Sequence, residues 1–229
     1  PSAHLGNVFA TNAALSPAMA NYGDIPWVNA GDFAEEDSVN GYLIQAEGIY
    51  SGYRYYETRY ADIVLGNGGA EAAAGTYATA DGTPAESAGT WDYSNEVVYP
   101  FGHGLSYTTF EQTLDAVDVP GDRRTADVSV TVTNTGSVAG KSVVQLYASA
   151  PYSDYDRENG IEKSAIQLLD FEKTAVLEPG ASQTIEMNVD LRNLASYDAA
   201  GAQTYVLSPG EYRFAIGTDS HDALNNVLA

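Results

Sequence analysis

The stretch Tyr99-Pro-Phe-Gly-His-Gly-Leu-Ser-Tyr-Thr-Thr-Phe110 divides the chain into two unlike parts. The sequence before it is aromatic and irregular, and the sequence after it alternates regularly between apolar and polar residues. Pro100 fixes its own φ angle and donates no hydrogen bond, while Gly102 and Gly104 tolerate positive φ. The stretch also carries large side chains that call for burial: Phe101, Leu105, Tyr107 and Phe110. We therefore expect residues 99–110 to form a packed junction between two domains, not a flexible linker.

Short runs with a two-residue period follow the junction. Val128, Val130 and Val132 alternate with Ser and Thr, and Asn134-Thr-Gly136 ends the run with turn residues. The same alternation recurs at 144–148, 185–189 and 212–216, and the turn signals Glu178-Pro-Gly180 and Ser208-Pro-Gly210 lie between these runs. This pattern predicts an antiparallel β-sandwich over residues 111–220, without a long α-helix. Its expected core includes Val130, Leu146, Met187 and Phe214.

Five tyrosines between Tyr50 and Tyr60 mark the segment before the junction. Tyrosine favours extended structure, so the segment is predicted to be a strand with Tyr53 and Tyr55 on one face and Arg54 on the other. One interpretation is a sugar-binding wall, in which Tyr53 and Tyr55 stack on pyranose rings and Arg54 binds hydroxyl groups. The other is an interdomain strand whose tyrosines bury their rings and hydrogen-bond at their tips. We favour the second and expect rings left uncovered by a missing domain to promote self-association into a homo-oligomer.

The rest of the N-terminal part has no sustained period. Residues 1–46 read as an irregular piece of a domain, and residues 66–96 are a Gly- and Ala-rich insertion that we expect to be a mobile surface excursion. A glycine-rich phosphate cradle at 66–96 is excluded, because no Lys lies nearby and no strand-to-helix pattern encloses the glycines.

Two acidic pairs and one acidic run are candidates for reactive or metal-binding groups. Glu47 and Glu57 could form a glycosidase pair only if the chain folded back, because ten extended residues span about 33 Å. Pairing of these carboxylates with Arg54 or Arg59 is the simpler expectation. Calcium binding by Asp154 and Asp156, or by Glu35-Glu36-Asp37, is less expected than a solvated loop at each place. His103, alone in a tight turn, is expected to be structural, since no Ser or Cys accompanies it in a catalytic pattern.

Composition excludes several classes of function. The 31 acidic and 10 basic residues give a net charge of −21, which disfavours nucleic acid and anionic membranes and suits a neutral ligand. The chain has no Cys, so disulfides and Cys-ligated zinc are excluded, and no cofactor or metal is expected. No apolar run approaches the roughly 20 residues of a membrane span, and no signal peptide opens the sequence. A cytoplasmic location is the expectation, with secretion as the alternative.

Several of these motifs together resemble family 3 glycoside hydrolases, the β-glucosidases and β-xylosidases. The junction Tyr99–Phe110 resembles the segment that joins their α/β sandwich domain to a fibronectin type III-like domain. Glu47-Gly-Ile-Tyr-Ser-Gly-Tyr-Arg-Tyr-Tyr56 is similar to a stretch before that junction, with Ser51 in place of the usual Val. The sandwich motifs that extend the resemblance are Val130–Gly136, Ala139–Tyr147, Leu169–Lys173, Leu177–Gly180 and Ser208–Tyr212.

The resemblance implies a domain order for the chain. Residues 1–98 would be the C-terminal part of the α/β domain, 99–110 the junction, and 111–220 a fibronectin III-like β-sandwich. Residues 221–229 would begin a linker to a catalytic barrel, as in the subgroup with reversed domain order, so we expect an excerpt of a longer protein. The fold class is thus mainly β, with an irregular remnant of an α/β domain before the sandwich.

The same resemblance implies a retaining exo-acting β-glycosidase as the parent enzyme, with a β-glucoside or oligosaccharide as its substrate. The family's Asp nucleophile and Glu acid/base motifs do not occur in these residues, so no catalytic residue is assigned. The chain is expected to be a non-catalytic region that braces the catalytic domains and borders the substrate cleft. The alternative is a stand-alone carbohydrate-binding or adhesive module, which would not need a packed junction.

Overall fold

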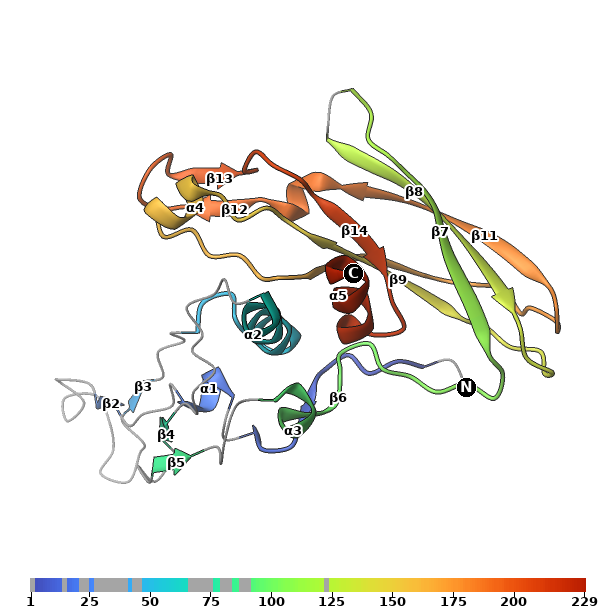
Figure 1. Cartoon of the computed structure of the whole chain (residues 1–229), viewed down its shortest axis with the longest axis horizontal. Coiled ribbons are helices and arrows are strands. Elements are labelled where there is room, and N and C mark those ends of the chain that lie inside the picture. Colours follow the sequence, from blue (N-terminus) through green and yellow to red (C-terminus); the bar gives the residue numbers. More distant parts are fainter. Residues whose placement is uncertain are drawn as a thin grey trace.

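The computed structural model describes residues 3–13, 16–20, 25–26, 41–42, 47–65, 76–78, 84–86, 92–121 and 124–229. Its largest part is a sandwich of two three-stranded antiparallel sheets (Figure 1). One sheet has the order β11-β8-β7, with strands Ser182–Asp190, Thr125–Asn134 and Phe110–Asp118. The other has the order β10-β9-β14, with strands Gln167–Lys173, Val143–Ser149 and Arg213–Ile216. The predicted antiparallel β-sandwich is confirmed.

The core lies between the two sheets, as the two-residue alternation indicates. Val128, Val130 and Val132 of β8 are fully buried, and Val130 lies opposite Ile185 of β11. Leu146 and Met187 belong to the same apolar cluster, and Phe214 packs against it while partly buried. The outward residues of β8 and β11 form cross-strand hydrogen bonds, such as Thr133 to Ser182 at 2.8 Å. Burial of this one face supplies most of the drive to fold.

Strand β9 departs from the alternating pattern, because both of its faces are covered. Every residue from Val144 to Ala148 is buried. Val144 and Leu146 point into the sandwich, whereas Tyr147 belongs to a second apolar cluster with Ile166, Ala223 and Leu224. Helices α2 (Tyr53–Leu65) and α5 (Ser220–Leu228) form this second layer on the β10-β9-β14 sheet (Figure 1).

The prediction of a strand at Tyr50–Tyr60 is wrong, because residues 53–65 form helix α2. Gly52, with φ of 56°, turns the chain immediately before the helix. The aromatic residues favour strands only where a sheet offers them neighbours, and here the packing against β9 and α5 decides. Successive helical residues lie about 100° apart, so Tyr53 and Tyr55 face nearly opposite directions. The proposed common face of these two rings does not exist.

The expectation that residues 221–229 begin a linker is also corrected. Residues 220–228, expected to begin a linker, form helix α5, which Asp219 caps by accepting a hydrogen bond from the Asp222 amide at 2.9 Å. Its apolar side chains Ala223, Leu224 and Val227 share one face and are buried. The apolar spacing of the tail therefore reflects packing on the sandwich.

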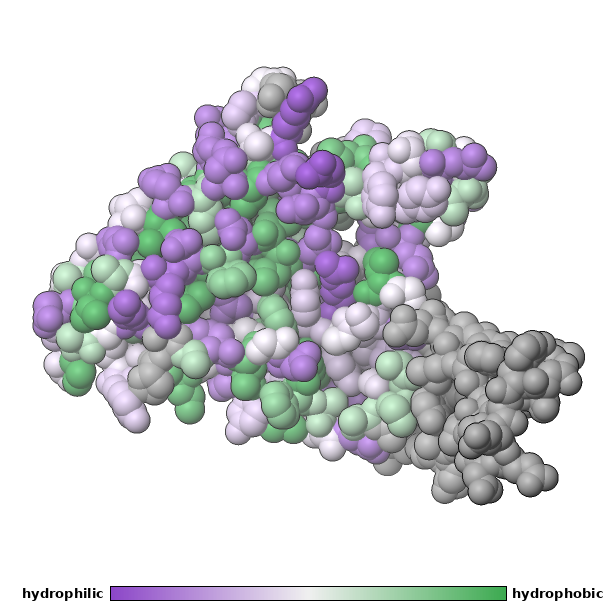
Figure 2. Space-filling model, turned by 180° about the vertical axis from the view of Figure 1, so that it is seen from behind, coloured by the Kyte–Doolittle hydropathy of each residue, from purple (hydrophilic) through white to green (hydrophobic). Residues whose placement is uncertain are grey.

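A short helix and a small hairpin extend one end of the sandwich. Helix α4 (Asp154–Glu158) begins with a capping box between Ser153 and Asp156. The 3₁₀ helix Leu191–Leu194 leads into the hairpin of β12 (Ser196–Asp198) and β13 (Thr204–Val206). Figure 2 shows hydrophilic residues spread over the coloured part of the visible face, as expected of a charge distributed along the chain.

The residues described before the junction form only short elements besides α2. Three two-stranded pairings join β1 (Phe9–Ala10) to β6 (Val97–Tyr99), β2 (Ile25–Pro26) to β3 (Gly41–Tyr42), and β4 (Thr76–Ala78) to β5 (Pro84–Glu86). The same described residues also include two four-residue helices, α1 (Pro17–Ala20) and α3 (Tyr93–Glu96). Most of the 66–96 insertion and the whole Glu35-Glu36-Asp37 run lie outside the described residues.

The described end of that insertion contradicts the expectation of a surface excursion. Tyr93 and Glu96 of α3 are buried, and Tyr93 belongs to a third apolar cluster with Tyr56 and Val97. Among the residues that the structure describes, none of the helices has the length and hydrophobicity needed to cross a membrane.

Candidate functional site

The interface between helix α2 and the sandwich combines ring stacking with hydrogen bonds from the sandwich backbone. The Tyr53 ring stacks on Phe101 of the junction, with centroids 4.7 Å apart, and meets the Tyr147 ring edge-on at 6.4 Å. Its hydroxyl oxygen accepts a hydrogen bond from the Leu168 amide at 3.0 Å. One turn further along the helix, the Thr58 hydroxyl oxygen accepts from the Ala165 amide at 2.9 Å. Helix α2 is thus fixed to strand β10 and the preceding loop.

A buried carboxylate joins α2 to two other helices. Glu57 is fully buried, and its Oε1 atom accepts hydrogen bonds from the Tyr93 hydroxyl at 2.6 Å and the Ser220 hydroxyl at 2.9 Å. Its Oε2 atom lies 2.9 Å from Nδ1 of His221, whose ring stacks on Tyr93 at 3.7 Å. Burial, followed by the Glu57 charge, raises the pKa of Tyr93. We call Glu57, Tyr93, Ser220 and His221 the carboxylate cluster.

The carboxylate cluster corrects the expectation for Glu57. In the described part of the chain its partners are hydroxyl groups and a histidine, and it forms no ion pair with Arg54 or Arg59. The sequence signal for these partners was weak, because Tyr93 lies in the low-complexity region and His221 in the expected linker. Only the formation of α2 and α5 brings positions 57 and 221 together. The fully buried oxygen atoms of Glu57 leave no access for a substrate.

The junction turn is held by a second polar group. Gln145 of β9 donates from Nε2 to the carbonyl oxygens of Gly102 at 3.0 Å and Thr218 at 3.1 Å. Its Oε1 atom accepts from the Tyr147 hydroxyl at 2.8 Å, and burial raises the pKa of Tyr147. Gly102 has φ of 85°, and a side chain there would collide with Gln145. The glycine is thus required both for the turn and for the close approach of β9.

The remainder of the junction is less buried than the sequence indicates. Phe101 and Phe110 are half-buried, but Leu105 and Tyr107 are 74% and 84% exposed. His103 stacks on Tyr99 at 5.1 Å, and its Nδ1 atom lies 3.9 Å from Asp219. These contacts agree with a structural role for His103.

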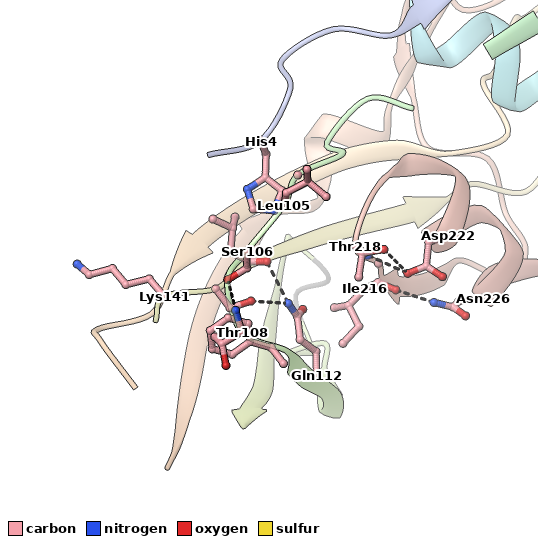
Figure 3. Close-up of a pocket in the computed structure, with 15 residues that line it drawn as sticks. His4, Leu105, Ser106, Thr108, Gln112, Lys141, Ile216, Thr218, Asp222 and Asn226 are labelled. Atoms are coloured by element: carbon pink, nitrogen blue, oxygen red, sulfur yellow. Dashed lines mark hydrogen bonds between the residues drawn. The ribbon is translucent and has the colours of Figure 1, made fainter. Parts of the chain in front are cut away.

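A pocket of about 320 Å³ lies beside the junction (Figure 3). Its polar side chains bond largely to one another: Asp222 accepts from the Thr218 amide and hydroxyl, and Asn226 donates to the Ile216 carbonyl oxygen. Gln112 donates to Ser142 and Val143. The Oε1 atom of Gln112 is buried without a partner in the described part of the chain. The pocket therefore lies at the contact between the junction, β14 and α5, and most of its polar groups are already hydrogen-bonded within the chain.

The three predicted sugar-binding residues occupy three different environments. Tyr53 is committed to the interface with Phe101. The Tyr55 ring meets Tyr56 edge-on at 5.0 Å, and its hydroxyl accepts from Arg59 at 2.6 Å. Arg54 alone lines an open groove, on the side of the β12–β13 hairpin. None of the tyrosines at 50, 53, 55, 56 and 60 is exposed, which corrects the expectation of uncovered rings in this segment.

The loop proposed as a solvated acidic segment holds a buried ion pair. Asp156 is fully buried and lies 2.9 Å from Nζ of Lys163, which also donates to the Pro151 carbonyl oxygen and the Ser208 hydroxyl. Burial would raise the pKa of Asp156, but hydrogen bonds from Ser208, Lys163 and Ser153 outweigh it and lower the pKa to about 2. The side chain is thus a structural anchor. Within the described residues, no group of three or more potential ligands is placed to hold a metal ion.

Comparisons with known proteins agree with this architecture. Residues 142–220 match the fibronectin type III-like domain family. The chain is 35% identical over 206 residues to β-glucosidase A of Butyrivibrio fibrisolvens, an alignment covering 83% of this chain and 20% of that relative. The chain therefore spans about a fifth of the length of the curated relative.

Solved structures extend the match beyond the sandwich. β-Glucosidase 3B of Thermotoga neapolitana, solved with α-D-glucose, matches 97% of this chain and 23% of its own, with 29% identity and a TM-score of 0.62. A family 3 β-glucosidase of Bifidobacterium adolescentis matches 98% of this chain and 25% of its own, with 27% identity and a TM-score of 0.66. Residues 142–220 therefore belong to the fibronectin type III-like domain family, and the chain as a whole is similar to the corresponding region, with its adjoining helical segment, of family 3 β-glucosidases.

Proposed function

We propose that this chain serves as a non-catalytic brace in an enzyme that removes terminal β-linked glucose or similar sugars. The observation that carries the proposal is the interface of helix α2 with the sandwich. Tyr53 and Glu57 fix α2 to the junction, to β10 and to α5 by stacking and buried hydrogen bonds. Because helix α2 is held by the junction, β10 and α5, it fixes the orientation of the sandwich relative to the domain before the junction.

The sugar substrate of the whole enzyme is part of this proposal. Support comes from relatives that are β-glucosidases, one of them solved with glucose. The catalytic barrel is the partner that this brace would serve, and the exposed side chains of Leu105 and Tyr107 beside the junction offer apolar area for such a contact. Self-association through the same area is a further part of the proposal.

The catalytic half of the proposal is tested with the purified 229-residue chain and an aryl β-glucoside. We expect no turnover, because the carboxylate of Glu57 is fully buried and is enclosed by Tyr93, Ser220 and His221. Glycosidase chemistry needs two carboxyl groups placed on either side of one bond. Turnover that disappears in Glu57→Gln would contradict the proposal.

The alternative is a stand-alone adhesive module, whose stability would not depend on the packing of helix α2 against the sandwich. Such a module would keep its stability without the Tyr53 contacts. In the brace, Tyr53→Ala removes a stacked ring and a hydrogen bond to Leu168, which should destabilise the chain by about 3 kcal/mol. An unchanged free energy of unfolding in Tyr53→Ala, measured by urea denaturation, would favour the free module.

A further inference from the structure

A groove of about 480 Å³ separates the start of helix α2 from the β12–β13 hairpin. Ile49 and Arg54 line one side, and Tyr197 and Tyr205 of the hairpin line the other. Gln167 and Asn193 contribute further to its wall. The volume is within the roughly 300–1,000 Å³ of typical small-ligand sites. The groove is distinct from the carboxylate cluster, none of whose residues lines it.

Two exposed aromatic rings stand at the edge of this groove. Tyr197 and Tyr205 lie opposite each other across the β12–β13 pairing, and their ring centroids are 5.3 Å apart with the planes at 67°. Their side chains are 53% and 69% exposed. Neighbouring exposed rings present apolar faces with polar hydroxyl tips, which is the surface that the C–H faces and hydroxyl groups of a sugar ring complement.

The hairpin that carries these rings is held rigidly. Asp198 is fully buried and accepts hydrogen bonds from the amides of Gly201 and Ala202, both at 2.7 Å. It also accepts from the Tyr155 hydroxyl of α4 at 2.6 Å, which fastens the hairpin to the sandwich. Gln203 closes the turn with φ of 52°. A platform fixed before binding loses little conformational entropy when a ligand arrives.

The groove also offers uncommitted hydrogen-bond donors. Arg54 is half-buried, yet its guanidinium group has no hydrogen-bond or ion-pair partner among the residues described. By contrast, the ammonium group of Lys163, which lines the same groove, is fully committed to Asp156, Pro151 and Ser208. A guanidinium group presents five N–H donors, more than any other side chain, and sugar hydroxyls accept such bonds readily.

We propose that the groove between Arg54 and the Tyr197–Tyr205 pair binds a neutral oligosaccharide. The net charge of −21 and the exposed Glu162 in the groove disfavour an anionic ligand, which Arg54 alone would otherwise attract. The rings supply stacking and Arg54 supplies hydrogen bonds, so binding needs no catalytic group. The site itself rests on these contacts, whereas the choice of β-linked glucose as the first ligand to test rests on the proposed function.

The test is an NMR titration of the isotope-labelled 229-residue chain with cellotetraose. We expect shifts confined to residues around Arg54, Tyr197 and Tyr205, with a dissociation constant of about 1 mM, as suits a shallow open site. Tyr205→Ala should weaken binding at least about tenfold. Tyr205→Phe, which retains the ring, should bind nearly as well as the natural chain.

The matched control is Tyr107→Ala, which removes another exposed tyrosine far along the chain and should leave binding unchanged. No localised shifts at about 10 mM cellotetraose and maltotetraose, or equal binding by Tyr205→Ala, would overturn the proposal. Self-association abolished by Tyr205→Ala, in place of sugar binding, would also overturn it. Preference for maltotetraose, with the same shifts, would support the groove while contradicting a β-glucoside setting.

Discussion

Removal of the Glu57 carboxylate should destabilise the chain more than any exposed substitution. In Glu57→Ala the hydroxyls of Tyr93 and Ser220 lose their shared acceptor, and both side chains are buried. A buried donor without a partner costs about 1–3 kcal/mol, and the space vacated by the side chain adds a similar amount. His221 is 24% exposed and can turn to water, so its loss weighs less. We expect a total of about 4 kcal/mol.

The assay is urea denaturation followed by circular dichroism, with the free energy of unfolding extrapolated to water. Glu57→Gln retains an oxygen acceptor for the two hydroxyls and should cost about 1–2 kcal/mol, less than the alanine variant. Glu186→Ala, which removes an exposed carboxylate on β11, serves as the control and should change stability by less than about 0.5 kcal/mol. A loss below about 1 kcal/mol in Glu57→Ala would refute the reasoning that the cluster is a structural anchor.

Three further outcomes follow from the same contacts. Val130→Asp places an unpaired carboxylate in the fully buried core, and the thermal midpoint should fall sharply, by the equivalent of several kcal/mol. Gly102→Ala, at φ of 85° and against Gln145, should cost about 2–4 kcal/mol by the same measurement, whereas Gly121→Ala, in open space, should not. The lowered pKa of Asp156 means that its ionised form stabilises the fold, so about 1–2 kcal/mol should be lost as the pH falls from about 4 to about 2, and Asp156→Asn should remove this part of the pH dependence.

The sandwich could be predicted from the sequence because each face of β8 and β11 has one environment. Val128, Val130 and Val132 face the core while their neighbours face water, so the period of two is visible. In β9 the period of two predicts one buried face, whereas both faces are buried. Gln145 and Tyr147 are as buried as Leu146, because the helices cover the outer face of their sheet. A polar residue that bonds to a distant turn cannot be distinguished from a solvated one without that turn.

The helical layer could not be predicted for a related reason. Tyr53 to Tyr60 favour strands by intrinsic propensity, and only contacts with Phe101, Tyr147 and α5 make a helix the better choice. The carboxylate cluster joins residues 57 and 221, which are 164 positions apart, and no local pattern encodes such a contact. Arg54 lines an open groove from a helix, so the alternation of strand faces expected for this segment is absent.

Hydrogen–deuterium exchange of the amides in α2 shows directly whether this helix and the sandwich open together as one cooperative unit. We expect residues 57–64 to exchange about as slowly as those of β10, because both open only when the Tyr53 and Glu57 contacts break. Tyr53→Ala should accelerate exchange in α2 and α5 while β8 stays protected. Rapid exchange of α2 in the natural chain, beside a protected β9, would contradict the claim that the helix braces the sandwich.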